Sequence, residues 1–321
     1  MMANGRIKTG LVRDYMSRTV IGCLPTATLI DVQDLLAENR IARVVVVDAD
    51  RRPVGIVSEK DVVDFVLSDE SMRGLDEITA SEVASPNLYT IGSFASVEQA
   101  AEVMIRKKIS SLVVMDGELE GIITKADVVT YMALTGSDWS TSDFMTPNPI
   151  TVKSAQPIFA AIVLILQHGI SRVIVTDREN KPVGIITLAD ISLASNLTNL
   201  SRLYVAGGPE VGAKLLKRSV VIRRITAGDF MTPQPLCVNS DSNLSVAAKL
   251  MSMHRISGIP VVSSLGELAG IISKTDITQA VAHSKALYRG ASSGEYKEAA
   301  SSPALDGTSP INGPTSLETQ S

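Results

Sequence analysis

Hydrophobic positions along the chain repeat in a fixed order: a helical spacing comes first, and two short apolar runs separated by a polar turn follow. In the first copy, apolar residues recur at spacings of three and four at Leu29, Val32, Leu35 and Leu36. This spacing predicts an amphipathic helix. The β-branched run 44–47 and the run 55–57, with the polar segment 48–53 between them, predict two strands joined by a hairpin.

The same order returns three times further along the chain. Helices are predicted at 97–105, 158–166 and 244–251, and each is followed by a predicted strand, at 112–115, 173–175 and 259–262. The third helix differs because it is apolar on every side. A helix without a polar face has to be covered, which predicts packing against a neighbouring unit or a second subunit.

The second strand of every copy ends in one short motif: glycine, two aliphatic residues, a hydroxyl residue and, three residues later, aspartate. The motif stands at 55–61, 121–127, 184–190 and 270–276. Its aliphatic pair predicts a buried strand, and Ser/Thr-x-x-Asp predicts the N-cap and third position of a following helix. The chain is therefore predicted to hold four β-α-β-β-α units in an α+β fold close to α/β. A unit of about 55–60 residues cannot bury a sufficient core alone, so the units should pair.

The repeated turn has two interpretations. It can simply cap a helix, which stabilises the fold by about 1 kcal/mol per turn. It can also aim a hydroxyl, a carboxylate and free backbone N–H groups at one spot, where they could hold the ribose and phosphate of a nucleotide. The candidate ligand-binding residues are Ser58, Asp61, Thr124, Asp127, Thr187, Asp190, Ser273 and Asp276.

Short openings mark where the units begin. Three units open with Asp-aromatic-Met-Ser/Thr, at 14–17, 143–146 and 229–232, and the second opens with the weaker 82–85. The methionines of these openings favour packing over metal binding. The expected division is units at 8–70, 76–136, 137–200 and 225–287, a basic insert at 201–224 and a disordered tail at 288–321.

Composition narrows the function without naming it. A net charge of −4 and a pI near 5.5 give no overall reason to expect a polyanionic partner. Cys23 and Cys237 form no CxxC pair, both fall in predicted strands, and no catalytic motif is present. The longest apolar run, 158–166, is far short of the roughly 20 residues that span a bilayer. A cytoplasmic, non-enzymatic protein without a covalent cofactor or a metal site is expected.

Taken together, the openings, the helix–isoleucine–strand segments and the four Gly-h-h-Ser/Thr-x-x-Asp turns resemble the CBS domain, the module named after cystathionine β-synthase. The resemblance covers residues 11 to about 285. It implies that consecutive domains pair into two pseudo-twofold Bateman modules, which bind AMP, ADP, ATP or S-adenosylmethionine in clefts between paired domains. It also implies that the hydroxyl and carboxylate of each turn contact the phosphate and the ribose of the ligand.

Each predicted first helix ends in a turn around an isoleucine, at Ile41, Ile109, Ile170 or Ile256. The family further tends to place a basic residue just after this isoleucine turn, facing the phosphates. Arg43 and Arg172 stand at this position in units one and three, and a guanidinium can hold phosphate with two hydrogen bonds. Units two and four have Ser111 and Gly258 there. The resemblance therefore implies one stronger and one weaker phosphate site in each module. The other interpretation of the two arginines is a solvated charge at the end of a strand.

The expected function is a stand-alone sensor that binds an adenine nucleotide, with or without Mg²⁺, and transmits its occupancy to a partner enzyme or to the second subunit of a homodimer. Two other functions stay open. One is a nucleic-acid-binding regulator that uses the basic insert, and the other is an oligomeric scaffold whose nucleotide sites are vestigial. The insert contributes Arg202, Lys214, Lys217, Arg218, Arg223 and Arg224. It lacks the interleaved aromatic residues that stack on bases.

Overall fold

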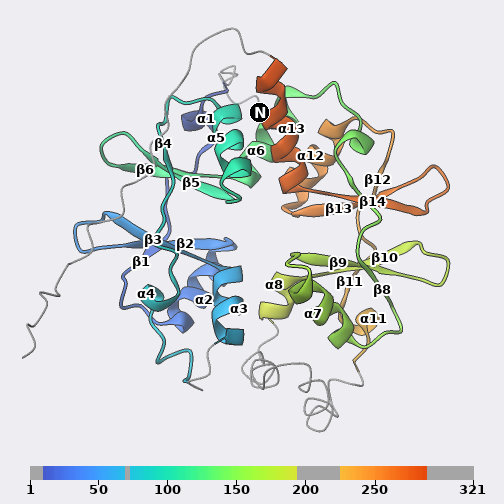
Figure 1. Cartoon of the computed structure of the whole chain (residues 1–321), viewed down its shortest axis with the longest axis horizontal. Coiled ribbons are helices and arrows are strands. Elements are labelled where there is room, and N and C mark those ends of the chain that lie inside the picture. Colours follow the sequence, from blue (N-terminus) through green and yellow to red (C-terminus); the bar gives the residue numbers. More distant parts are fainter. Residues whose placement is uncertain (1–9, 69–72, 194–224, 288–321) are drawn as a thin grey trace, which may run out of the picture.

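The computed structural model describes residues 10–68, 73–193 and 225–287 (Figure 1). The basic insert and the tail lie outside these residues. Unit one comprises α1 (Val12–Tyr15), β1 (Gly22–Cys23), α2 (Leu29–Asn39), β2 (Arg43–Val47), β3 (Pro53–Ser58) and α3 (Glu59–Ser68). Unit two comprises α4 (Ala80–Val83), β4 (Thr90–Ile91), α5 (Val97–Arg106), β5 (Ser111–Met115), β6 (Leu119–Thr124) and α6 (Lys125–Thr135).

The second half of the chain repeats this order. Unit three comprises the 3-10 helix η1 (Thr141–Asp143), β7 (Thr146–Pro147), β8 (Thr151–Lys153), α7 (Ile158–Gln167), β9 (Arg172–Thr176), β10 (Pro182–Thr187) and α8 (Leu188–Leu193). Unit four comprises α11 (Ala227–Phe230), β11 (Thr232–Pro233), β12 (Val238–Asn239), α12 (Leu244–His254), β13 (Gly258–Val262), β14 (Leu268–Ser273) and α13 (Lys274–Leu287). The predicted β-α-β-β-α order is confirmed in all four units.

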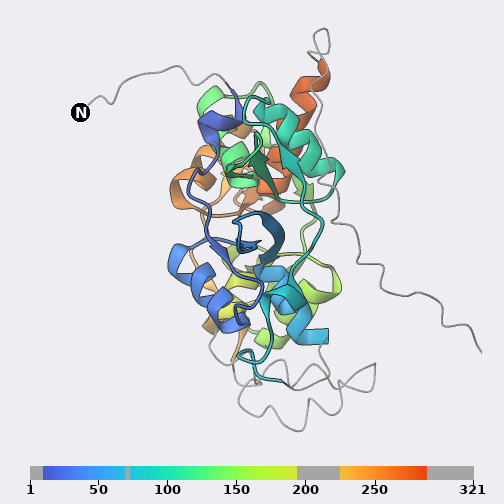
Figure 2. The same cartoon turned by 90° about the vertical axis from the view of Figure 1, so that its left-hand side faces the viewer.

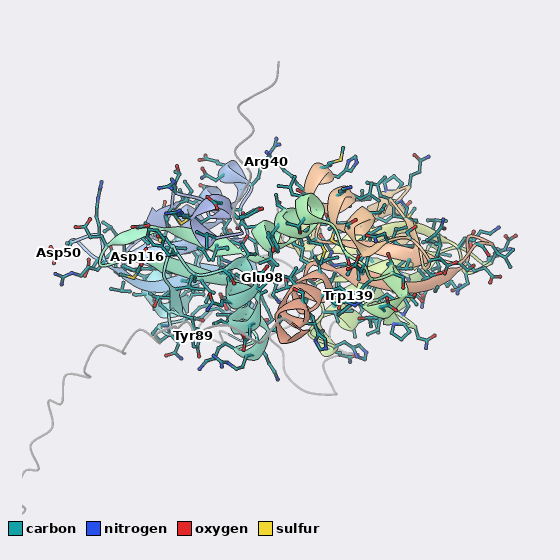
Figure 3. All side chains as sticks on the ribbon, turned by 90° about the horizontal axis from the view of Figure 1, so that it is seen from above. Arg40, Asp50, Tyr89, Glu98, Asp116 and Trp139 are labelled. Atoms are coloured by element: carbon teal, nitrogen blue, oxygen red, sulfur yellow. The ribbon has the colours of Figure 1, made fainter. Side chains whose placement is uncertain are left out.

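Each unit has a small mixed sheet. Its first strand runs parallel to the second, and the second and third form an antiparallel hairpin, as in β1-β2-β3 and β4-β5-β6. The four units form a ring in which the hairpin loops lie at the outer rim and the opposite strand ends face the middle (Figure 1). Figure 3 places Asp50, in the β2–β3 loop, at this rim. The four Gly-h-h-Ser/Thr-x-x-Asp turns (the signature turns) lie at the inner ends of the hairpins.

The opening segment of each unit pairs with the sheet of its neighbour rather than with its own. In the first module Ser17 bridges Ile122 of β6, and Ser85 bridges Ile56 of β3. In the second module β7 pairs with β14, and β11 pairs with β10. Figure 1 shows α4 among the blue elements of unit one and α11 beside α7. Figure 2 shows the dark-blue α1 in the upper half, beside the teal helices of unit two.

This exchange explains why the signature motif begins with glycine. An added Cβ on Gly121 would lie 2.6 Å from the Ser17 carbonyl oxygen and 3.0 Å from Sδ of Met16. Met231 covers Gly184 in the same way, and Met145 covers Gly270. The opening methionines therefore pack on the glycines of the paired unit, which confirms that their role is packing. In unit one, Ala84 of the weaker opening takes this place against Gly55.

Within the described residues, the cores of units two and four are joined. A single hydrophobic cluster runs through units two and four, and Met104 and Met251 are fully buried in it. Its helices pack as α5 on α13 and α6 on α12. Units one and three have separate clusters, and there α3 lies against α8.

The chain between the modules is anchored to unit four by aromatic contacts. Trp139 lies edge-on to Phe144, with ring centroids 5.1 Å apart, and Phe144 lies edge-on to His283 of α13 at 6.3 Å. Figure 3 shows Trp139 beside the red-brown ribbon of α13. The aromatic residue of the third opening thereby fixes the path of the chain from one module to the next.

Two expectations from the sequence need correction or refinement. Cys23 is buried in β1, but Cys237 is half-buried and precedes β12, because that strand begins only at Val238. Helix α7 buries Ile158, Ala161 and Ile165, whereas its other apolar side chains stay partly exposed within this single chain. None of the helices in the described ranges is long and apolar enough to cross a membrane.

Candidate functional site

In all four units the aspartate of the signature turn accepts hydrogen bonds from the hydroxyl residue three positions before it. In unit one, Oδ2 of Asp61 accepts hydrogen bonds from the backbone N and the hydroxyl of Ser58, at 2.8 and 2.6 Å. The corresponding pairs are Thr124–Asp127, Thr187–Asp190 and Ser273–Asp276, with distances of 2.7 or 2.8 Å. The capping interpretation of the motif is thus confirmed.

Capping uses only one oxygen of each aspartate. Within the described part of the chain, Oδ1 of these four residues accepts no hydrogen bond. An ionised carboxylate has about four acceptor positions, so the capped side chains still have capacity for a ligand hydroxyl. Helix capping and ribose binding are therefore compatible roles for the same residue.

A second set of hydrogen bonds joins each turn to the start of the preceding strand. The backbone N of the residue after the hydroxyl donates to the carbonyl of the residue after the isoleucine turn. The four pairs are Glu59–Ala42 at 3.1 Å, Lys125–Ser110 at 3.1 Å, Leu188–Ser171 at 2.8 Å and Lys274–Ser257 at 3.2 Å. The residue that opens each strand, where the sequence predicts a phosphate contact, consequently lies next to the signature turn.

Arg43 opens β2 in unit one but makes its hydrogen bonds in unit two. Its Nη1 donates to the Ser110 carbonyl at 2.9 Å, and its Nη2 donates to the Ser110 hydroxyl at 2.7 Å. The guanidinium therefore crosses between the paired domains and lies beside the unit that has Ser111 in place of an arginine. It is not a solvated charge at a strand end.

Arg172 has the equivalent position in the second module. It opens β9 and lies over Gly258 of unit four, where an added Cβ would be 3.0 Å from its Cζ. Its Nε and Nη2 donate to the Ser171 hydroxyl at 3.2 and 2.8 Å. Gly258 leaves room for this side chain. Each module thus has one arginine placed between its two domains.

The structure adds two lysines that sequence reasoning missed. Lys125 and Lys274 follow the signature hydroxyl in units two and four. The Lys125 ammonium donates to the Thr275 hydroxyl at 3.0 Å and so reaches from the first module into the second. Lys274 interacts electrostatically with Asp127 and Glu59 of the first module. The position differs among the four copies, and only the recurrence of lysine in two of them could have signalled a role.

Burial lowers the pKa values of these four cationic side chains, because it disfavours their charged forms. It lowers the pKa of Arg172 to about 10 and also lowers the pKa of Arg43. Burial lowers the pKa of Lys125, with Arg43 adding to the effect, and it lowers that of Lys274, to which Arg172 and Arg43 contribute. The four positive charges therefore influence one another across the middle of the ring.

The carboxylates of this region are desolvated as well. Burial raises the pKa of Asp127 and of Asp276, and the capping hydrogen bonds from Thr124 and Ser273 oppose the change. Burial also raises the pKa of Glu59, against the opposing charges of Arg43 and Lys274. Yet among the described residues no carboxylate lies within 4.0 Å of the nitrogens of the four cations. Half-buried cations without a paired carboxylate are suited to bind an anion.

Comparisons with known proteins agree with this architecture. The sequence profile of the CBS domain matches residues 12–68, 80–134, 142–196 and 227–283. The crystal structure of protein MJ1225 from Methanocaldococcus jannaschii superposes with a TM-score of 0.66 at 21% identity, over 84% of this chain and 99% of that chain. This likeness shows the fold. The crystal structure of CBSX2 in complex with AMP is 28% identical and covers 46% of this chain and 98% of its own, with a TM-score of 0.36.

Curated relatives extend beyond the region they share with this chain. Protein MJ1404 of Methanocaldococcus jannaschii is 25% identical over 284 residues, which is 85% of this chain and 62% of that protein. The chain likewise spans 59% and 60% of two further relatives, from Thermofilum pendens and Methanopyrus kandleri.

Proposed function

We propose, starting from the fact that this chain belongs to the CBS-domain family, that it is a regulatory protein that binds adenine nucleotides without transforming them. Ligand would bind between the paired domains of each module, with Mg²⁺ accompanying the polyphosphates. Occupancy would be transmitted to a partner enzyme or to a second copy of the chain. A ligand can do this only if it binds two arrangements of the domains with unequal affinity.

One observation carries the proposal: four half-buried cations and four capped aspartates meet at the inner ends of the hairpins. Arg43 and Arg172 would hold phosphate, because a guanidinium donates two parallel hydrogen bonds to phosphate oxygens. The uncapped Oδ1 of an aspartate such as Asp127 would accept from a ribose hydroxyl. The N-termini of α3, α6, α8 and α13 add a favourable potential for an anion.

The identity of the base, adenine, rests on the resemblance to the CBS family and not on the geometry of the site. The resemblance to CBS domains implies an adenosine-bearing ligand. CBSX2, which is 27% identical to this chain over 150 residues, has been crystallised with AMP, and we carry that ligand class over as part of the proposal. S-Adenosylmethionine stays an alternative occupant, and its lack of phosphate makes it distinguishable in a binding experiment.

Calorimetric titration of the purified chain with AMP, ADP, ATP and S-adenosylmethionine tests the proposal. At least one nucleotide should bind, and Arg43→Ala should weaken it about tenfold or more, because a hydrogen bond to a charged group contributes about 1.5–3 kcal/mol. Arg43→Lys, which keeps the charge and loses the fork, should also weaken binding. Arg178→Ala, in the exposed β9–β10 loop, removes the same charge far from the site and serves as the matched control.

The scaffold alternative makes the opposite prediction. If the sites were vestigial, none of the four ligands would bind, and Asp61→Ala and Asp190→Ala would leave every property except helix capping unchanged. Absence of heat and of a thermal shift with all four ligands at millimolar concentration would refute nucleotide sensing. The nucleic-acid alternative rests on the insert at 201–224, outside the described residues. Salt-dependent retention on DNA or RNA would support it.

A further inference from the structure

One position of the signature turn changes its charge from unit to unit while its backbone does not change. The residue after the hydroxyl makes the same backbone hydrogen bond in all four units, so the four side chains start from equivalent points. The residues are Glu59, Lys125, Leu188 and Lys274. Two lysines, one aliphatic side chain and one carboxylate thus project from equivalent points at the inner ends of the hairpins.

Side chains at this position reach the middle of the ring. Lys125 demonstrates the reach directly, because its ammonium donates to Thr275 of the opposite module at 3.0 Å. Glu59 stands at the matching place in unit one and interacts electrostatically with Arg43 of its own unit and with Lys274 of the opposite module. Asp190 of unit three, which has the same sign of charge, also interacts with it electrostatically.

Glu59 therefore introduces a negative charge into the group that would hold phosphates. No cation of the described residues lies within 4.0 Å of its carboxylate, so no close ion pair masks that charge. With every group ionised, the middle of the ring holds four cations and five carboxylates, counting Glu59 with the four signature aspartates, and its net charge is −1. Without Glu59 it would be neutral, and with lysine there, as in units two and four, it would be +1.

We infer that Glu59 is a specificity-determining residue that makes the site favour nucleoside monophosphates over di- and triphosphates. Each added phosphate brings negative charge toward the Glu59 carboxylate, and like charges repel strongly where water is partly excluded. A repulsive group of this kind is a general way to reject a close relative of the preferred ligand. The inference rests on the proposed function, because it concerns the phosphate end of the same site.

The test is the ratio of affinities for AMP, ADP and ATP in Glu59→Gln, measured by calorimetry with EDTA present so that no divalent cation neutralises the phosphates. Glutamine keeps the length of the side chain and removes its charge. The affinity for ATP relative to AMP should rise about tenfold, and the gain for ADP should lie between the two. Glu59→Lys should raise the ATP-to-AMP affinity ratio further. S-Adenosylmethionine, which has no phosphate, should show no such gain.

Asp64→Asn is the matched control. Asp64 lies on the same helix, α3, its side chain is 53% exposed and pairs with Lys60, and the substitution changes the net charge by the same amount. It should leave the ratio at the wild-type value. Glu59→Leu, which copies the residue of unit three, provides a second neutral variant if the glutamine variant proves unstable.

The outcomes are separable from those of the proposed function. Wild-type protein that binds none of the ligands refutes the sensor itself. Wild-type protein that binds nucleotides, with the ATP-to-AMP ratio unchanged in Glu59→Gln and Glu59→Leu, refutes the role of Glu59 and leaves the sensor standing. An equal change of the ratio in Asp64→Asn also refutes it, because overall charge would then explain the effect.

Discussion

Replacing Gly184 by alanine should destabilise the second module, because the added Cβ would enter the space filled by Met231 of the exchanged opening. It would lie 2.6 Å from Cγ and 2.9 Å from Cβ of that methionine, well inside van der Waals contact. Overpacking of this kind costs about 1–3 kcal/mol of unfolding free energy. Met231→Ala removes a half-buried side chain and should cost about 1–2 kcal/mol, below the range for a fully buried methionine.

The double variant Gly184→Ala/Met231→Ala tests the reasoning. Removing Cγ and Sδ makes room for the new methyl group. The double variant should therefore be destabilised by about 1–2 kcal/mol less than the sum of the two single variants. The recovery should be partial, because the Cβ of residue 231 stays 2.9 Å away. Urea unfolding followed by far-UV circular dichroism measures each term.

Gly55→Ala is the matched control for this cycle, since Gly55 has the same place in unit one. Its added Cβ would meet the methyl group of Ala84 at 3.0 Å and no methionine, so a smaller cost of about 1 kcal/mol is expected. Strict additivity in the double variant, or a Gly184→Ala protein as stable as wild type, would show that the exchanged methionine does not set the requirement for glycine.

Two further predictions concern charge and core. Asp127 has a raised pKa in the folded chain, so its contribution to stability is fully present below its unfolded pKa of about 4 and is lost as the pH rises through the folded value. The unfolding free energy of wild type relative to Asp127→Asn should therefore fall as the pH rises from about 4, and a difference that stays constant in urea titrations would contradict this. Met251→Ala empties a fully buried position and should cost about 2–5 kcal/mol. Because the cluster is shared, hydrogen exchange should accelerate in α5 and α6 of unit two as well as in unit four, and acceleration confined to unit four would disprove the shared core.

The sequence predicts the elements of this fold well because each unit repeats its own local signals. The spacing from Leu29 to Leu36 lies within α2, and the Ser/Thr-x-x-Asp pairs are the caps of α3, α6, α8 and α13. The stretch from the isoleucine to the signature glycine is shorter in unit two (Ile109 to Gly121) than in unit one (Ile41 to Gly55), and this corresponds to the tight β5–β6 turn, where Gly117 has a φ of +91°. These features depend on residues close together in the chain, and such signals are visible without a structure.

The features that the sequence does not reveal depend on contacts between units. Nothing in the opening 14–17 indicates that it pairs with β6 of unit two, since a segment so short has no registration signal of its own. The reach of Arg43 to Ser110 likewise joins residues 67 positions apart. Lys125, Lys274 and Glu59 become notable only when the ring brings four turns together, because along the chain that position looks variable.

The reciprocal pairing of the openings has a practical consequence for dissecting the protein. A fragment that ended after unit one would keep an opening whose docking site had been cut away, and it would leave Gly55 and the edge of β3 bare. Exposed strand edges of this kind invite aggregation. No portion smaller than a whole pair, such as the span from 10 to 136, is accordingly suited to expression in isolation, and single-unit truncations should be avoided in mapping experiments.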